Sequence, residues 1–138
     1  MLIIRQEQID HFIKGSDEEF IEFLLKHIKG EHPELKSKHK DETLREMIRG
    51  GIERAKTHDF STAEDLTAFV SVMFEIAPNF DEQPEIKAIV DDENTPPNQR
   101  LDKLWTPVFP KEAWEEAENN YDENAWFPER MKNETSGN

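Results

Sequence analysis

The sequence contains no cysteine, which excludes a disulfide framework, a thiolate nucleophile and any zinc site built on cysteine. Long apolar runs are also missing. The N-terminal run from Met1 to Ile4 is too short for the core of a signal peptide. No stretch approaches the roughly 18–20 consecutive apolar residues that a membrane-spanning helix needs. We therefore expect a cytoplasmic protein with no membrane partner.

Motifs for catalysis and for cofactor binding are missing as well. No serine lies in a GxSxG elbow, and the chain has neither a glycine-rich phosphate loop nor an HExxH pair. The spacing of His27 and His32 does not place both rings on one helix face. The acidic run from Asp91 to Glu93 lacks the alternating ligands, the turn glycine and the distal glutamate of a calcium loop. We therefore predict no enzyme activity, no cofactor and no metal site.

Charge of one sign dominates the second half of the chain. The formal net charge is -14, yet residues 1–58 hold 11 Lys and Arg against 12 Asp and Glu, whereas residues 59–138 hold 6 against 19. Such a field repels nucleic-acid phosphates and anionic membranes, and it attracts basic proteins. We expect no nucleic-acid partner. Simple solubility, a basic protein partner and mimicry of DNA all remain open as explanations of the charge.

Apolar residues recur every three to four positions in the first half, which predicts helices with one apolar face. We expect one long helix at about 5–30. Ser16 and Glu19 offer the alternative of a capping box that starts a second helix inside this range. A further helix is expected at about 41–57 with Asp41 as its N-cap. It contains Gly50-Gly51, a pair that indicates either close approach of another helix backbone or a hinge.

The third long helix is the clearest one, because Ser61 and Glu64 form a capping box before an apolar stripe that ends at Pro78. Prolines then recur, and they favour short helices at about 84–92, 97–106 and 110–120. The fold class is therefore all-α, a compact bundle of three longer helices plus two or three short C-terminal helices. We expect a single helical domain over 1–121 and an aromatic-containing, largely irregular tail over 122–138.

Aromatic residues gather in the acidic half and provide the candidate binding residues. Trp105 and Trp114 fall on apolar helix faces, which favours the core. Trp126 and Phe127 follow an acidic, loop-like stretch, so they either fold back as a plug over the bundle or anchor a partner. The candidate partner-binding residues are Trp126, Phe127, Tyr121, Asp122, Glu123, Glu115 and Glu116.

Three segments resemble a group of small bacterial proteins that are encoded beside type VI secretion effectors. These segments are residues 1–9, the run Ile48-Arg49-Gly50-Gly51-Ile52-Glu53-Arg54-Ala55, and the run Phe74-Glu75-Ile76-Ala77-Pro78-Asn79-Phe80-Asp81. The resemblance covers about residues 1–105, and Ala77 stands where glycine is common in that group. It implies a helical chaperone or co-adaptor that binds a secretion effector or its loading adaptor.

Charge keeps a second function open, that of an immunity protein that neutralises a basic toxin effector. Both functions are non-catalytic and need a protein partner. The residues alone leave open which of the two applies, which face binds and which oligomeric state the protein adopts.

Overall fold

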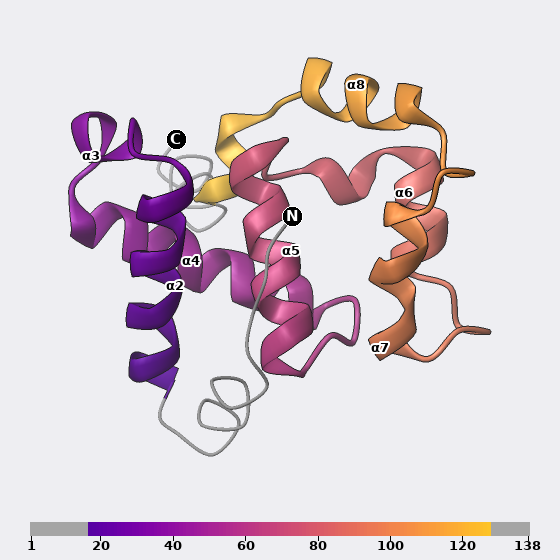
Figure 1. The fold of residues 1–138 in the computed structure, drawn as a ribbon, viewed down its shortest axis with the longest axis horizontal. Coiled ribbons are helices and arrows are strands. Elements are labelled where there is room, and N and C mark those ends of the chain that lie inside the picture. Colours follow the sequence, from indigo (N-terminus) through magenta and orange to yellow (C-terminus); the bar gives the residue numbers. More distant parts are fainter. Residues whose placement is uncertain (1–16, 128–138) are drawn as a thin grey trace, which may run out of the picture.

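The structure is a computed structural model that describes residues 17–127, and every regular element in that range is a helix (Figure 1). The all-α prediction is therefore confirmed, and so is the bundle of three longer and several shorter helices. The longer helices are α2 (Asp17–Glu31), α4 (Asp41–Lys56) and α5 (Ala63–Glu75). The shorter ones are α6 (Pro84–Val90), α7 (Pro97–Arg100) and α8 (Lys111–Asn119).

Four smaller elements connect these helices. The short helix α3 (Leu35–Lys38) lies in the basic stretch between α2 and α4. Single 3₁₀ turns form η1 (Phe80–Glu82), η2 (Leu101–Trp105) and η3 (Glu123–Trp126). The helix expected at 97–106 is thus α7 followed by the tighter η2. Residues 5–16 of the predicted first helix and residues 128–138 of the predicted tail lie outside the described residues.

Two of the predicted helix caps are wrong by one residue. The N-cap of α5 is Thr62, not Ser61, because the Thr62 hydroxyl accepts a hydrogen bond of 3.1 Å from the Asp65 backbone N–H. The N-cap of α4 is Lys40, whose side chain makes no capping bond. Asp41 lies in the first turn of α4 instead, where its carboxylate accepts a hydrogen bond of 2.9 Å from the Lys29 ammonium group.

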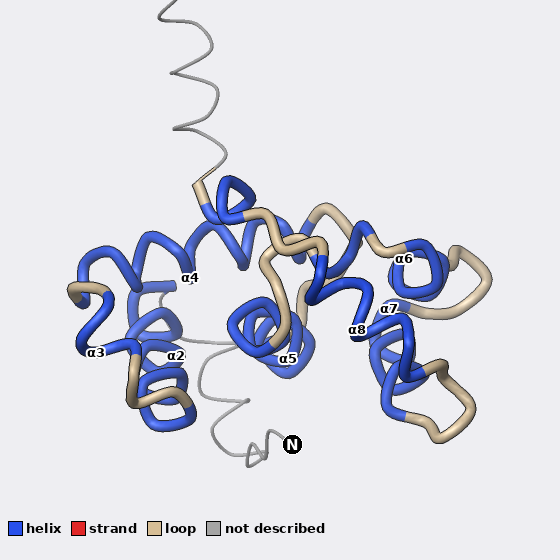
Figure 2. The backbone as a smooth tube through the Cα atoms, turned by 90° about the horizontal axis from the view of Figure 1, so that it is seen from above, coloured by secondary structure: helices blue, strands red, loops and turns tan. Residues whose placement is uncertain are grey.

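Helix α5 lies at the centre of the molecule, with α2 and α4 on one side and the short C-terminal helices on the other (Figure 2). Its sequence is apolar almost all round, which is typical of a helix buried on several sides. Phe69 on α5 packs between the rings of Phe60 and Phe80, with ring centroids 5.8 and 4.8 Å away. This aromatic contact joins α5 to the segments that precede and follow it.

Close packing, not a hinge, accounts for the two adjacent glycines of α4. A Cβ atom on Gly51 would lie 3.0 Å from Met73 Sδ and 3.1 Å from a methyl group of Val70. A Cβ atom on Gly50 would lie 3.3 Å from the backbone oxygen of Trp126. The prediction of a close approach is therefore right. The groups that approach are side chains of α5 and the backbone of η3, not the backbone of another long helix.

Candidate protein-docking surface

Helix α8 places a row of carboxylates on the surface. Ala113 and Ala117 face the core and are buried, while the other side of the helix exposes Glu112, Glu115, Glu116 and Glu118. None of these four glutamates forms an ion pair with any of residues 17–127. Like charges four residues apart destabilise a helix. The last turn of α8 also carries no basic residue to offset the negative end of the helix dipole. Glu112 lies in the first turn, where negative charge is favourable, but Glu115, Glu116 and Glu118 lie further along the helix and add nothing to its stability.

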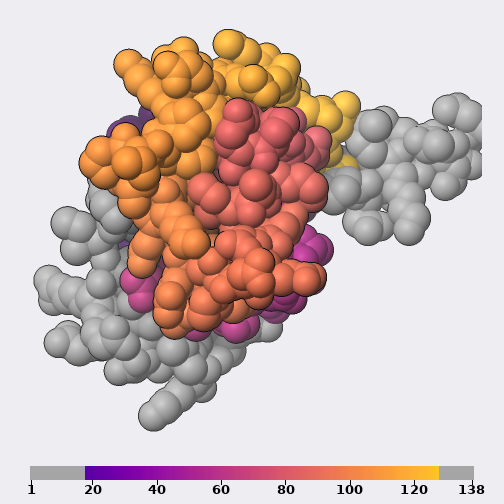
Figure 3. All heavy atoms as spheres, turned by 90° about the vertical axis from the view of Figure 1, so that its right-hand side faces the viewer, coloured from indigo at the N-terminus to yellow at the C-terminus, as the bar shows by residue number. Residues whose placement is uncertain are grey.

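Exposed apolar groups lie beside this acidic helix. Trp105 is 41% exposed and stacks on Trp114, with ring centroids 5.5 Å apart and ring planes only 3° from parallel. Val108, in the connection to α8, is 90% exposed. Figure 3 shows the face of the molecule on which α6, α7, η2 and α8 come together. We call Trp105, Val108, Trp114 and the four exposed glutamates of α8 the α8 face.

The exposure of Trp105 corrects the prediction that it belongs to the core. That prediction assumed α-helical spacing through residue 106, which would put Leu101, Leu104 and Trp105 on one face. The segment is instead a 3₁₀ turn with three residues per turn, so Leu101 and Leu104 line up and point inward together. Trp105 is thereby turned to the edge of the core, where Trp114 covers one side of its ring.

Trp126 folds back over the bundle. Its side chain is only 3% exposed, and its ring centroid lies 4.5 Å from that of Phe74. The indole N–H donates a hydrogen bond of 2.8 Å to the hydroxyl oxygen of Tyr121. The missing side chain of Gly50 leaves room for the Trp126 backbone. Because Trp126 is buried, it is not available to anchor a partner, and the alternative that it folds back as a plug over the bundle is supported.

The other candidate residues lie at or near the surface. Tyr121 is exposed, Phe127 is half-buried, and Glu123 is exposed at the start of η3. The Asp122 carboxylate caps η3 by accepting a hydrogen bond of 3.0 Å from the Asn124 backbone N–H, so this residue has a structural role. Glu115 and Glu116 belong to the α8 face.

A groove runs between α2, α5 and η2 and encloses about 610 Å³. Its floor is apolar and consists of Ile28, Ala68, Val72 and Leu101, and Trp105 of the α8 face lies at its edge. Exposed carboxylates surround this floor, namely those of Glu31, Glu64, Glu75 and Asp102, and the buried carboxylate of Asp65 also lines the groove. We call this feature the α5 groove, since α5 provides one wall along its length.

The carboxylates of the α5 groove repel one another. Burial raises the pKa of Asp65, and the nearby charges of Glu64 and Asp102 raise it further against the opposing hydrogen bond with Thr62. Within residues 17–127, neither Asp65, Glu64, Asp102 nor Glu75 has a cation as an ion-pair partner. The ionised groove is therefore less stable than it would be with a cation bound.

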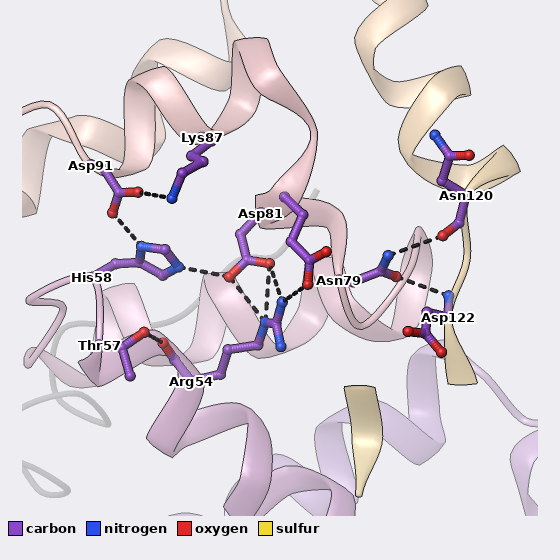
Figure 4. A network of polar contacts seen from close by, with 10 residues as sticks. Arg54, Thr57, His58, Asn79, Asp81, Lys87, Asp91, Asn120 and Asp122 are labelled. Carbon is purple, nitrogen blue, oxygen red and sulfur yellow. Dashed lines mark hydrogen bonds and ion pairs between the residues drawn. The ribbon is translucent and has the colours of Figure 1, made fainter. Parts of the chain in front are cut away.

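A separate polar network joins α4 to η1 and α6 (Figure 4). The Asp81 carboxylate accepts hydrogen bonds from Arg54 Nη2 at 2.7 Å and from His58 Nε2 at 2.6 Å. The other ring nitrogen, His58 Nδ1, lies 2.5 Å from an oxygen of Asp91, whose second oxygen accepts a bond of 2.9 Å from Lys87. Arg54 also donates a bond of 2.9 Å to Glu82, so six side chains from α4, η1, α6 and the residues just after α4 and α6 are linked in one chain of contacts.

The network fixes the His58 ring between two carboxylates. Burial lowers the pKa of His58, but its hydrogen bonds to Asp81 and Asp91 outweigh burial and raise that pKa above its ordinary value. Burial likewise raises the pKa of Asp81, but bonds from His58 and Arg54 outweigh this effect and lower it. Both ring nitrogens are occupied by carboxylates, so His58 has no nitrogen available for a substrate.

Sequence reasoning did not identify this network. Arg54 and Asp81 do belong to two of the segments that carry the resemblance described above, which is the signal that could have paired them. Nothing in the sequence near His58 or Asp91 indicates that they meet, because 33 residues separate them.

Two further findings concern chemistry and membranes. Among residues 17–127, no group of three or more His, Asp or Glu side chains is placed to hold a metal ion. In the same range, no helix combines the length and the apolar character that crossing a membrane requires.

No protein-family model, no curated protein and no solved structure matches this chain.

Proposed function

We propose that this protein is a non-catalytic accessory protein that binds a basic surface of another protein through the α8 face. The observation that carries the proposal is the row of four exposed glutamates on α8 that have no ion-pair partner among the described residues. The charge of three of them, Glu115, Glu116 and Glu118, weakens the helix itself. A cationic partner would remove that cost.

Charged groups and apolar groups of the α8 face contribute differently to binding. Exposed carboxylates accelerate the encounter with a basic partner, because attraction acts over roughly a Debye length of 8–10 Å at physiological salt. Trp105 and Val108 provide apolar area that a partner can bury, and a tryptophan surrounded by charge is a common centre of binding energy. Raising the salt concentration is therefore expected to slow association more than it accelerates dissociation.

The resemblance to proteins encoded beside type VI secretion effectors supports a particular partner class. On this basis the partner is a secretion effector or its loading adaptor, and the protein acts in the cytoplasm as a chaperone or co-adaptor before loading. The acidic α8 face is compatible with this role because it can cover a basic region of a cargo protein until transfer.

The same unpaired carboxylates also support the second candidate, an immunity protein that covers the basic active site of a toxin. The two candidates differ in what happens to the toxin. An immunity protein protects a cell that expresses the toxin alone. A chaperone stabilises the effector, leaves it toxic, and is needed for its secretion.

The experiment is a pull-down from the native cell with the full chain, followed by identification of the bound protein. The test variant Glu115→Lys/Glu116→Lys reverses charge on the α8 face. The matched control Glu42→Lys/Glu53→Lys makes the same change on α4, where the two side chains are 78% and 77% exposed. We expect the test variant to lose the partner and the control to keep it. Equal retention by both variants would refute the proposal.

A further inference from the structure

The α5 groove follows one face of α5. Its wall on α5 consists of Glu64, Asp65, Ala68, Ser71, Val72 and Glu75, which follow helical spacing along one face from one end of the helix to the other. A helix of this length is about 20 Å long. The two side chains at mid-length, those of Ala68 and Ser71, are small, so a second helix can approach α5 closely there.

Apolar and acidic groups are separated across the groove. The floor is formed by aliphatic side chains of three elements, and carboxylates lie above it on α2, α5 and η2. The surface that complements this arrangement is a helix with one apolar face flanked by lysine or arginine. Such a helix would bury its apolar face on the floor and place its cations among the carboxylates.

Two buried polar atoms also lack partners in the groove. Ser71 Oγ and His27 Nε2 are shielded from water, and neither has a hydrogen-bond partner among residues 17–127. The nearest carboxylate oxygen to His27 Nε2, on Glu31, is 3.6 Å away, beyond hydrogen-bond distance. Burial lowers the pKa of His27, and the charge of His32 lowers it further against the effect of Glu31. A neutral imidazole and a hydroxyl can both accept hydrogen bonds from a cationic side chain.

We propose that the α5 groove docks a basic amphipathic helix of the partner protein. This inference rests on the proposed function, because it supposes a protein partner, and it adds the partner's local structure and a second contact region. Trp105 lies both in the α8 face and at the edge of the groove, so one partner can occupy the two together.

Charge favours this occupant over two others. The chain's own residues 1–16 contain an apolar stripe, but Arg5 and Lys14 are offset by Glu7 and Asp10, so the segment has no excess positive charge for the rim. A second copy of the chain carries the same net charge of -14 and would be repelled. A basic helix alone matches both the floor and the rim.

The first experiment measures binding of a fluorescently labelled synthetic peptide to the full chain by anisotropy. The probe is an amphipathic helix of about 14 leucines and lysines, long enough to span α5. The control peptide has glutamate in place of every lysine. We expect the lysine peptide to bind, with an affinity that falls at least about threefold between 50 and 200 mM salt. Equal binding of both peptides, or of neither, would overturn the inference.

Substitutions then locate the contact. Ala68→Trp fills the middle of the groove and is expected to weaken peptide binding at least about tenfold. Glu64→Gln/Asp102→Asn removes two rim charges without adding bulk, so it serves even if Ala68→Trp does not fold, and a loss of about threefold or more is expected. Glu42→Gln/Glu53→Gln removes the same charge from α4, outside both proposed contact regions, as the matched control. A larger loss in this control than in the groove variant would place the peptide elsewhere and refute the proposal.

A final comparison separates this inference from the proposed function. If Glu64→Gln/Asp102→Asn still captures the native partner while Glu115→Lys/Glu116→Lys does not, the function stands and the groove inference falls. If the triple variant Ile9→Ser/Phe12→Ser/Ile13→Ser binds the lysine peptide about tenfold more tightly, the chain's own N-terminal segment is the occupant, and the inference also falls. Unchanged peptide affinity in that variant supports a partner helix.

Discussion

The contact between α2 and α4 and the surface of α8 use charge in opposite ways. Across α2 and α4, Arg45 donates to Glu22 at 2.6 Å, Lys29 to Asp41 at 2.9 Å, and Arg49 to Glu18 at 3.3 Å. On α8, the exposed glutamates have no such partner among residues 17–127. Carboxylates of the first region thus stabilise the fold, whereas those of the second region remain available for another molecule. This difference explains why the excess negative charge of the second half of the sequence is available to a partner.

The largest difference in stability is expected between substitutions of the buried Trp126 and of the exposed Trp105. Trp126→Ala removes a buried ring and is expected to lower the free energy of unfolding by about 3–5 kcal/mol, because the cavity cannot be filled locally. Trp105→Ala should lower it by less, about 1–2 kcal/mol, because the ring stacks on Trp114 but is 41% exposed. Urea denaturation of both variants measures the difference. Equal costs would mean that Trp126 does not pack as described.

Asp81→Ala tests the polar network and is expected to cost about 3 kcal/mol of unfolding free energy, since it leaves Arg54 and His58 without their buried partner. The control Glu115→Ala removes a carboxylate from α8 and should change stability by no more than about 0.5 kcal/mol. Urea denaturation near neutral pH compares the two. The contrast between internally paired and unpaired charge fails if both variants unfold alike.

The network also predicts a dependence of stability on pH. The pKa of His58 is raised in the folded state, so its contribution is present below the unfolded pKa and is lost as pH rises through the folded pKa. The pKa values of Asp81 and Asp91 are lowered, so their contributions are present above the unfolded pKa and are lost as pH falls through the folded values. Thermal unfolding between acidic and alkaline pH measures both losses. His58→Gln should abolish the alkaline one, and an unchanged alkaline loss would contradict this account.

A smaller effect of opposite sign is expected in the α5 groove. Asp65 has a raised pKa, which means that the folded state disfavours its ionised form and loses stability as pH rises through that value. Asp65→Asn keeps the shape of the side chain and removes this repulsion, so it should stabilise the protein near neutral pH by up to about 1 kcal/mol. Thermal unfolding near neutral pH shows the gain, which should vanish in acid. A loss of stability would indicate that Asp65 already has a cation beside it.

The smallest change in stability is expected on α8. Glu115→Gln/Glu116→Gln relieves like-charge contacts and should stabilise the fold by only a few tenths of a kcal/mol. The same substitutions should slow association with a basic partner, because steering depends on exposed charge. Stopped-flow binding at two salt concentrations tests this. A gain in stability without any change in association rate would leave the α8 carboxylates without a role in binding.

Much of the helical architecture could be predicted, because apolar spacing and proline positions act locally. The stripe that ends before Pro78 predicted α5, and Pro84 and Pro97 lie in the first turns of α6 and α7 as expected. Errors occurred where the backbone geometry itself changed. A 3₁₀ turn in place of an α-helical one at η2 moved Trp105 from the core to the surface. Periodicity alone does not distinguish these two turns.

The candidate site was predictable only in part. Glu115 and Glu116, predicted as partner-binding residues, are exposed, because charge on the outer side of a short amphipathic helix is a local property. Burial of Trp126 depends on a distant event, the approach of its backbone to Gly50. The α5 groove is composed of three segments that no local pattern connects.

Local patterns in the sequence therefore determined that this protein is helical, where its main helices lie and that its second half is acidic. Only the tertiary structure decided which charges are neutralised. An ion pair forms between residues that folding brings within a few ångströms, and their separation in the chain carries no information about that distance. Arg54 meets Asp81 and His58 meets Asp91 for this reason, while the exposed carboxylates of α8 and those of Glu64, Asp65, Glu75 and Asp102 in the α5 groove meet no cation within residues 17–127.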